Sequence, residues 1–294
     1  MGIDDILAQK GIVLSANQVA EDLEVGDLFI VQSKSGYRFT SDSVLLANSV
    51  KNIASKHVVE LCSGSGVISI LLAYKQRPSS VVAVEFQQSL YNNCLLSLKI
   101  NNQQDIIKPL CLDCNDILSA ITNKRQSLSV KQSNLTAKPN SVEDINLDGK
   151  ISLIANDYLN YFQDVDCVVA NPPYRKLNSG QTQQNQEILL ARHEVGLTLQ
   201  QLLALSSAIL KDSGSFYLIH QVQRLSEIMV LASHYNLQPK ELTFICARQG
   251  VSPKTVIIKA TKCGKVGLTI LPDIIIFDKD GNYTQTVKQL YGKV

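Results

Sequence analysis

Four consecutive residues, Asn171-Pro172-Pro173-Tyr174, offer the acceptors and the flat surface that a planar amino group needs. Two prolines directly after an apolar run end a strand there, fix the backbone and leave carbonyl groups free to accept hydrogen bonds. The side-chain oxygen of Asn171 and the backbone carbonyl of Pro172 can take the two N–H bonds of an amine, while Tyr174 stacks on the attached ring. The tetrapeptide therefore predicts a catalytic site for a planar NH2 group; a proline-rich turn is the structural alternative.

A second set of residues predicts a nucleoside pocket. Gly64 and Gly66 lie where an apolar strand gives way to a helix, so the backbone can turn sharply there and approach a ligand. No Lys follows these glycines, which excludes a P-loop for nucleoside triphosphates. Glu60 precedes them, and the carboxylate of Glu85 at the next strand end can accept both hydroxyls of a ribose. Asp113 ends a third strand and suits an adenine amine, although Asp is also an ordinary turn residue.

The two sites together predict methyl transfer to an amine. An aromatic amine is a poor nucleophile, and acceptors on its hydrogens stabilise the positive charge that develops as it attacks. A sulfonium methyl group is already activated, so in-line positioning does much of the rest. No strong general base is needed, and we interpret His220, at a later strand end near the same crevice, as a packing residue.

The elements that must position these residues follow from the alternation of apolar strand-like runs with helical patterns. Strands are expected at 57–62, 80–85, 107–112, 165–170, 215–220, 241–247 and 255–260, and helices at 67–75, 88–101, 195–210 and 225–235. Such alternation predicts a mostly parallel sheet with helices on both faces. The loop 248–254 is too short for a parallel crossover, so the last two strands must be antiparallel. We predict an α/β fold with a seven-stranded sheet and one reversed strand.

The length of 294 residues suits one domain with additions. Residues 1–56 precede the first core strand and are interpreted as an N-terminal extension packed on the core domain, 57–294. A stretch at about 119–150 is rich in Ser, Asn, Lys and Gln. It is too long for an ordinary connection, so we interpret it as a polar surface insertion.

Composition excludes several classes of protein. A net charge of only +2 argues against a nucleic-acid coat or a membrane-surface protein. The N-terminus lacks the apolar region of a signal peptide and no apolar run is long enough to cross a bilayer, so we expect a soluble, cytoplasmic protein. Seven scattered Cys suit buried thiols in a reducing compartment. Cys111 and Cys114 form a lone CxxC without further ligands, so no metal is expected.

Several charged side chains stay open to two interpretations. A cluster of lysines near the C-terminus is either a solvated face or a contact for an RNA backbone: Lys254, Lys259, Lys262 and Lys265. Arg192 either opens a helix together with Glu194 or contacts a phosphate. Arg38 either holds the extension on the core or contacts a cofactor carboxylate.

At these motifs the chain resembles the NPPY group of class I S-adenosylmethionine-dependent methyltransferases, and above all the bacterial tRNA1(Val) (adenine(37)-N6)-methyltransferase family. The resemblance covers most of 28–118 and 165–292. The tetrapeptide is shared by several families. The segment from Gly36 to Ala47 and the Ala191-Arg192-His193-Glu194 stretch narrow the resemblance considerably.

The resemblance implies a class I, Rossmann-like methyltransferase fold, S-adenosyl-L-methionine as cofactor and a tRNA substrate methylated on an adenine N6. It also implies site roles. The cofactor would lie against Phe39, Thr40, Cys62, Gly64, Gly66, Glu85, Asp113 and Cys114, with Glu60 at the acidic start of the loop; the target amine would lie against Asn171, Pro172 and Tyr174. Cys62 stands where the family's loop has its first glycine, and the insertion lies outside the family's pattern.

Three other functions stay open. A glutamine amide is also a planar NH2, so a protein glutamine N5-methyltransferase acting on release factors is the first alternative, although residues 1–56 are short for the helical N-terminal domain of such enzymes. An rRNA guanine-N2 methyltransferase is the second. The third is a catalytically idle RNA-binding scaffold, which would have no need of amine acceptors such as Asn171 beside a cofactor pocket.

Overall fold

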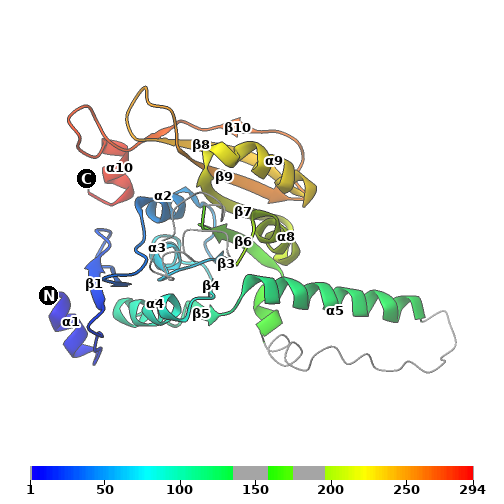
Figure 1. Ribbon diagram of the computed structural model, residues 1–294, viewed down its shortest axis with the longest axis horizontal. Helices are drawn as coiled ribbons and strands as arrows, with labels where there is room; N and C mark the ends of the chain where they lie inside the picture. Colours follow the sequence, from blue (N-terminus) through cyan, green and yellow to red (C-terminus); the bar gives the residue numbers. More distant parts are fainter. Residues whose placement is uncertain (1, 135–157, 175–195, 294) are drawn as a thin grey trace.

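The computed structural model describes residues 2–134, 158–174 and 196–293 (Figure 1). Within them the main sheet has nine strands. The seven long strands are β3 (His57–Leu61), β4 (Ser80–Glu85), β5 (Ile107–Cys111), β6 (Val165–Ala170), β7 (Leu210–Gln221), β8 (Leu237–Cys246) and β9 (Thr255–Lys262). Their order is β8-β9-β7-β6-β3-β4-β5, and β9 alone of these seven runs antiparallel to its neighbours. The predicted sheet is confirmed. Two short strands, β10 (Thr269–Ile270) and β11 (Ile274–Ile275), extend it beside β8.

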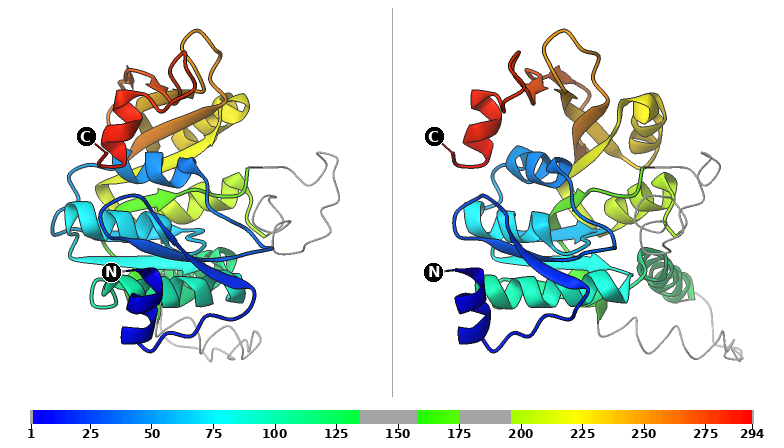
Figure 2. Two further views of the ribbon diagram at one scale, coloured as in Figure 1. Left: turned by 90° about the vertical axis from the view of Figure 1, so that its left-hand side faces the viewer. Right: turned by 60° about the vertical axis from the view of Figure 1, so that its left-hand side comes forward.

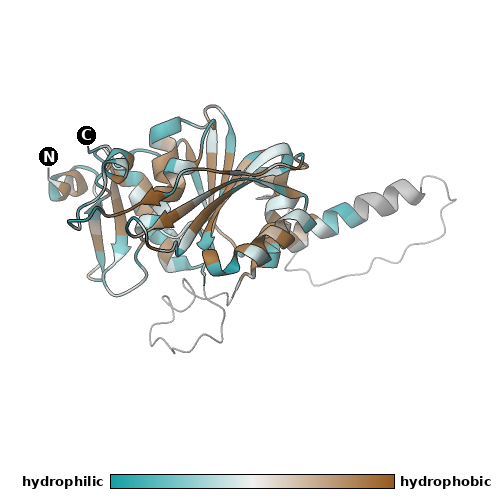
Figure 3. Cartoon of the chain, turned by 90° about the horizontal axis from the view of Figure 1, so that it is seen from above, coloured by the Kyte–Doolittle hydropathy of each residue, from teal (hydrophilic) through white to brown (hydrophobic). Residues whose placement is uncertain are grey.

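Helices cover both faces of the sheet (Figure 2). One layer holds α2 (Ser41–Ser49), α3 (Val67–Gln76) and α4 (Gln88–Asn101), and the other holds α5 (Cys114–Asn134), α8 (Leu199–Ile209) and α9 (Leu225–His234). Alternate strand residues face opposite layers. Val58 therefore belongs to the apolar core under α2 and α3, while Val59 belongs to the core under α8. The apolar strands lie at the centre of the molecule (Figure 3), as a sheet buried on both faces requires.

The N-terminal residues pack on α4. A short helix, α1 (Ile3–Gln9), precedes an antiparallel hairpin of β1 (Gln18–Asp22) and β2 (Phe29–Ser33). The Asn101 side chain bonds both backbone groups of Phe29, at 2.9 and 2.6 Å, and the Ser97 hydroxyl accepts from Val31 N at 2.9 Å. At the other terminus, α10 (Gln285–Leu290) lies beside α2 and α3, where Lys75 Nζ donates to Leu290 O. A division between extension and domain at residue 56 remains our proposal.

Most predicted bounds lie within two residues of the observed ones, and the larger differences are at α5, α8, β7 and β8, of which β8 begins at Leu237 rather than 241. Helix α8 begins at Leu199 rather than 195, because Thr198 caps it: its hydroxyl accepts from Gln201 N at 3.2 Å. Strand β7 begins at Leu210, five residues early, since its first residue already pairs with β6. Helix α5 continues to Asn134 and projects from the body (Figure 1), so the first part of the presumed insertion is helical. Residues 135–157 lie outside the described chain. Two single-turn helices, η1 (Asn160–Phe162) and η2 (Val222–Arg224), complete the fold.

Candidate active site

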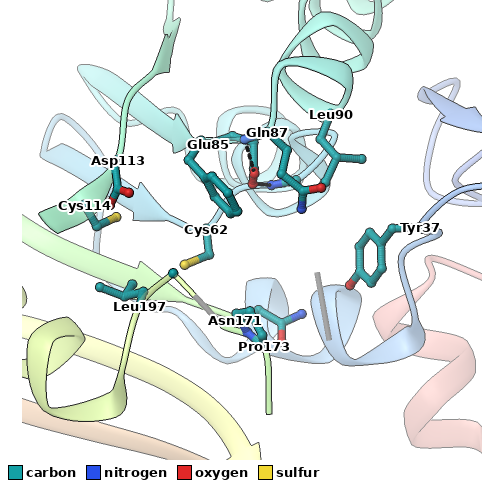
Figure 4. A pocket seen from close by; sticks show the side chains of 13 residues that line it. Tyr37, Cys62, Glu85, Gln87, Leu90, Asp113, Cys114, Asn171, Pro173 and Leu197 are labelled. Carbon is teal, nitrogen blue, oxygen red and sulfur yellow. Dashed lines mark hydrogen bonds between the residues drawn. The ribbon is translucent and has the colours of Figure 1, made fainter. Parts of the chain in front are cut away.

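Four neighbouring strands end around one cavity. Gly64 follows β3, Glu85 ends β4, Asp113 follows β5 and Asn171 follows β6 (Figure 4). Parallel strands bring their carboxyl ends to one edge, which is where open α/β sheets bind ligands. The lining is completed by Tyr37, Cys62, Phe86, Gln87, Leu90, Cys114, Pro173, Gly196 and Leu197. The cavity thus joins the predicted nucleoside pocket and the predicted amine site.

The loop after β3 has left-handed backbone angles. Cys62 has φ +60°, Gly64 φ +56° and Gly66 φ +88°. Gly66 is the N-cap of α3, and a Cβ built there would lie 2.7 Å from Cys94 Sγ. A side chain at position 66 would therefore meet both backbone strain and a steric clash. The positive φ of Cys62 gives a physical reason for glycine at this position of the family's loop.

Glu85 holds this loop from the neighbouring strand. One carboxylate oxygen accepts from Gly64 N at 2.8 Å and the other from Gln87 N at 2.9 Å. The side chain is 5% exposed and points into the cavity (Figure 4). A carboxylate offers about four lone-pair sites, so it can accept more bonds than these two. Glu85 is therefore both an anchor for the loop and a fitting acceptor for vicinal hydroxyls.

Two thiols meet on the cavity wall. Cys62 and Cys114 contact each other, and both face the same space (Figure 4). The hydrogen bond with Cys114, followed by burial, raises the pKa of the Cys62 thiol well above its ordinary value. Cys62 therefore contributes neutral, polarisable surface beside Cys114. Asp113, beside them, accepts from Asn115 N at 2.8 Å and so also fixes the start of α5.

The tetrapeptide Asn171–Tyr174 is tied to the first turn of α2. Asn171 Nδ2 donates to Ser43 Oγ at 3.1 Å. The Tyr174 hydroxyl contacts Asn171 Oδ1 and lies 3.2 Å from Asp42 Oδ2. Burial raises the pKa of Tyr174 well above its ordinary value, so this hydroxyl keeps its hydrogen. Its ring packs on His220, with centroids 5.0 Å apart.

His220 is a neutral packing partner of Tyr174. The imidazole is fully buried, and burial lowers its pKa to about 4. Its Nδ1 accepts from Gln221 N at 2.8 Å, which puts the remaining hydrogen on Nε2. Nε2 has no hydrogen-bond partner among the described residues. A neutral ring whose one lone pair is engaged fits the interpretation of this residue as packing.

Glu60 does not face the cavity. Its carboxylate accepts from Ser69 N at 2.8 Å and contacts the Ser69 hydroxyl, and the residue is 1% exposed. Position 60 shares a strand face with Val58, and that face lies under α3. We therefore correct the predicted cofactor contact to a structural role at the first turns of α3.

Burial raises the Glu60 pKa from 4.5 to about 8, so the folded state holds a proton that the unfolded chain releases. Its contribution to stability is thus present at low pH and lost as pH rises from about 4.5 to 8. Glu60→Gln removes this titration while keeping an acceptor for Ser69. The stability of the variant relative to the wild type should rise from pH 5 to pH 8, as measured by urea unfolding. A difference independent of pH would contradict the prediction.

Five further predicted site residues do not line the cavity. Thr40 is the N-cap of α2 and is exposed, and Phe39 N donates to Gln32 Oε1 while its ring packs on the core. Gly66 lies behind the loop, beside Cys94. Pro172 is buried, and its neighbour Pro173 lines the cavity instead. Tyr174 packs inward. Residues 191–194 lie outside the described chain.

Sequence reasoning also missed lining residues. Phe86 and Gln87 directly follow Glu85 and could have been found by extending that strand end. Tyr37 lies in the segment from Gly36 to Ala47, but no local pattern predicts that it lies across the cavity from Asn171 (Figure 4). Leu197 reaches the cavity from the segment before α8, where the Asn115 side chain holds the Gly196 carbonyl.

The described residues contain neither a metal site nor a membrane-spanning helix. Within residues 2–134, 158–174 and 196–293, no three His, Cys, Asp or Glu side chains form a group that could hold a metal ion. Over the same residues, no helix is long and apolar enough to span a bilayer.

Comparison with known proteins agrees with this geometry. The tRNA1(Val) (adenine(37)-N6)-methyltransferase of Shewanella baltica strain OS195 is 26% identical over 256 residues, covering 87% of this chain and 90% of the relative. The enzyme of the same name from Porphyromonas gingivalis strain W83 is 24% identical over 238 residues, covering 78% and 76%. A predicted O-methyltransferase from Agrobacterium tumefaciens has a similar structure, with TM-score 0.56 and 18% identity over 86% of this chain and 96% of that one. The chain is a methyltransferase of the class I fold. No family model matches it.

These relatives confirm the resemblance that the motifs indicated. The described residues fit S-adenosylmethionine, the cofactor that the resemblance implied. The glycine loop leaves space that a side chain would fill, and Glu85 offers a carboxylate where a ribose needs acceptors. Phe86 and Leu197 add apolar surface for the rest of a nucleoside.

Proposed function

We propose that this methyltransferase transfers the methyl group of S-adenosylmethionine to the N6 amine of an adenine in tRNA. One observation carries the proposal: Asn171, at the end of β6, lines the same cavity as Gly64 of the glycine loop that follows β3. An amine acceptor and a nucleoside pocket on adjacent strands bring an amine and a methyl donor together. The names of the curated relatives favour adenine 37 of a tRNA as the target.

The cofactor would be held from three strand ends. Gly64 would allow the methionine end to approach the backbone, Glu85 would accept the ribose hydroxyls, and Asp113 would accept from the adenine amine. Cys62 and Cys114 would form the floor beneath it. When bound, the cofactor supplies an electrophilic methyl group on a sulfonium.

The protein's own contribution is orientation of the target amine. Asn171 Oδ1 and the Pro172 carbonyl would accept its two hydrogens and stabilise the charge that develops on nitrogen. His220 has its lone pair engaged by Gln221 N, so it supplies no base. The released proton therefore leaves to solvent after transfer.

The proposal is tested by transfer of labelled methyl from S-adenosylmethionine to unmodified total tRNA, with release factor and ribosomal RNA as parallel acceptors. Label recovered from tRNA as N6-methyladenosine supports it. Label only in release factor would establish the glutamine-amide activity, and label only in ribosomal guanine would establish the guanine-N2 activity. Cofactor binding without label in any acceptor would favour the scaffold.

A tRNA backbone needs basic contacts near the cavity. The four lysines of the C-terminal cluster differ in whether they can provide such a contact. Lys254 precedes β9 at the edge of the sheet that holds the cavity, and its carbonyl accepts from Val222 N at 3.0 Å. Strand β9 lies two strands from β6, a separation of roughly 10 Å. Lys265 lies past the opposite end of β9. Lys259 pairs with Glu241, and Lys262 donates to Ser207 O, so both are engaged internally.

Lys254→Glu is therefore expected to raise KM for tRNA by about 3- to 10-fold and to flatten the salt dependence of binding by about one unit of slope, because a phosphate contact is lost. Lys265→Glu is the matched control: the residue is also exposed, but on the far edge, so tRNA binding should stay near wild type. Filter binding at several salt concentrations measures both. Equal effects of the two variants would exclude a local contact at Lys254.

A tRNA substrate and the relatives together favour a cytoplasmic location, which we include in the proposal.

A further inference from the structure

Two side chains of α2 reach the amine-binding motif from a distant part of the chain. Ser43 Oγ lies 3.1 Å from Asn171 Nδ2, and Asp42 Oδ2 lies 3.2 Å from the Tyr174 hydroxyl. The paired positions are 128 and 132 residues apart in sequence. Ser43 is 6% exposed and Asp42 is half-buried, so these bonds are shielded from water and are more than surface contacts.

Ser43 holds the Asn171 amide through a hydrogen bond from α2. An amide presents an oxygen on one side and an NH2 on the other, and its partners fix the orientation. The Ser43 hydroxyl accepts from Nδ2, which leaves Oδ1 for a donor. An amine needs Oδ1 rather than Nδ2, since two N–H groups facing each other repel. Without the hydroxyl at position 43, the Asn171 amide loses a partner that holds it in place.

The Tyr174 hydroxyl occupies the acceptor that the target amine would use. It has one hydrogen and two acceptors in reach, Asn171 Oδ1 and Asp42 Oδ2. An amide oxygen has two lone pairs, so an amine either shares Oδ1 with the hydroxyl or displaces it; a displaced hydroxyl needs another partner, because a buried hydroxyl without one is costly. Asp42 offers that partner without any movement of the ring, which stays on His220.

We propose that Ser43 and Asp42 are positioning residues for methyl transfer: Ser43 presents Asn171 Oδ1 to the amine, and Asp42 receives the Tyr174 hydroxyl that the amine displaces. The inference rests on the proposed function for the nature of the amine. Asp42 also suits the positive end of α2, which by itself would affect stability alone.

The role of Ser43 is tested with an isosteric pair. Ser43→Thr and Ser43→Val place the same bulk in the core, but only Thr keeps a hydroxyl. We expect Ser43→Val to lower kcat by about 10- to 100-fold relative to Ser43→Thr, because a misoriented acceptor misplaces the amine. KM for S-adenosylmethionine should be equal in the two variants. Ser41→Ala, in the same turn, is the control for the helix end. Equal kcat for Thr and Val would overturn the role of Ser43.

The role of Asp42 is tested in two backgrounds. Asp42→Asn keeps an acceptor and should retain kcat within about threefold, whereas Asp42→Leu should lower it by about 10-fold or more. In a Tyr174→Phe background no hydroxyl needs a partner, so Asp42→Leu should have no further effect. The same loss in both backgrounds would overturn the role of Asp42.

A binding measurement separates this inference from the proposed function. Adenosine and purine riboside differ only in the 6-amino group, and both are titrated against the enzyme with bound S-adenosylhomocysteine. The wild type should prefer adenosine by about threefold or more, as one satisfied hydrogen bond gives, and Ser43→Val should lose the preference. An unchanged preference, or none in the wild type, would overturn the inference. Failure to methylate any tRNA, with the preference intact, would overturn the proposed function alone.

Discussion

Asn171→Ala is expected to lower kcat by about 100- to 1,000-fold, the usual effect of removing one preorganised group that stabilises transition-state charge. Asn171 lines the cavity at the end of β6, where we propose its Oδ1 as the side-chain acceptor for the amine. The affinity for S-adenosylmethionine should stay near wild type, because the proposed cofactor contacts come from the ends of β3, β4 and β5. Single-turnover methylation of tRNA and calorimetric cofactor titration measure the two quantities separately.

Asn160→Ala is the matched control, since Asn160 is exposed in η1 and remote from the cavity. It should leave both kcat and cofactor affinity unchanged. If Asn171→Ala kept most of the wild-type kcat, the amine would have to be held elsewhere, and the mechanism proposed above would be wrong.

Gly66→Ala is expected to destabilise the protein by about 2–4 kcal/mol and to weaken cofactor binding strongly. The new Cβ would lie 2.7 Å from Cys94 Sγ, and φ at this position is +88°. Relief requires movement of the glycine loop, which Glu85 holds through Gly64 N. Urea unfolding gives the stability, and titration with S-adenosylmethionine gives the affinity.

Two variants separate the clash from the backbone strain. Gly250 has φ +77° with open space around its Cβ, so Gly250→Ala should cost only the strain, about 1 kcal/mol. Cys94→Ala removes the atom in conflict, and Gly66→Ala in that background should recover the part of the loss due to the clash. No recovery there would show that the backbone angle alone accounts for the effect.

Local patterns along the chain were enough to predict the main elements and the loop chemistry. Strands β4 and β6 and helix α4 begin and end at the predicted residues, because apolar periodicity and strand-end residues are local signals. The glycines after β3 and the prolines after β6 have local reasons too, since glycine permits left-handed backbone angles and proline restricts the backbone at its own position. Parallel strand ends then had to meet at one edge, which is why Gly64, Glu85, Asp113 and Asn171 share a cavity.

The contacts between side chains, in contrast, depend on the packed fold. Glu60 turns under α3 to Ser69, while Tyr37 and Leu197 reach the cavity from segments whose path no local pattern fixes. The contacts of Asp42 and Ser43 with the tetrapeptide join positions more than a hundred residues apart. Such contacts depend on how helices pack on the sheet, because packing fixes the distance and burial of groups that have no relation along the chain. The backbone conformation of the loops depends on the residues at those positions, whereas the positioning of the proposed amine acceptor depends on how the folded core packs.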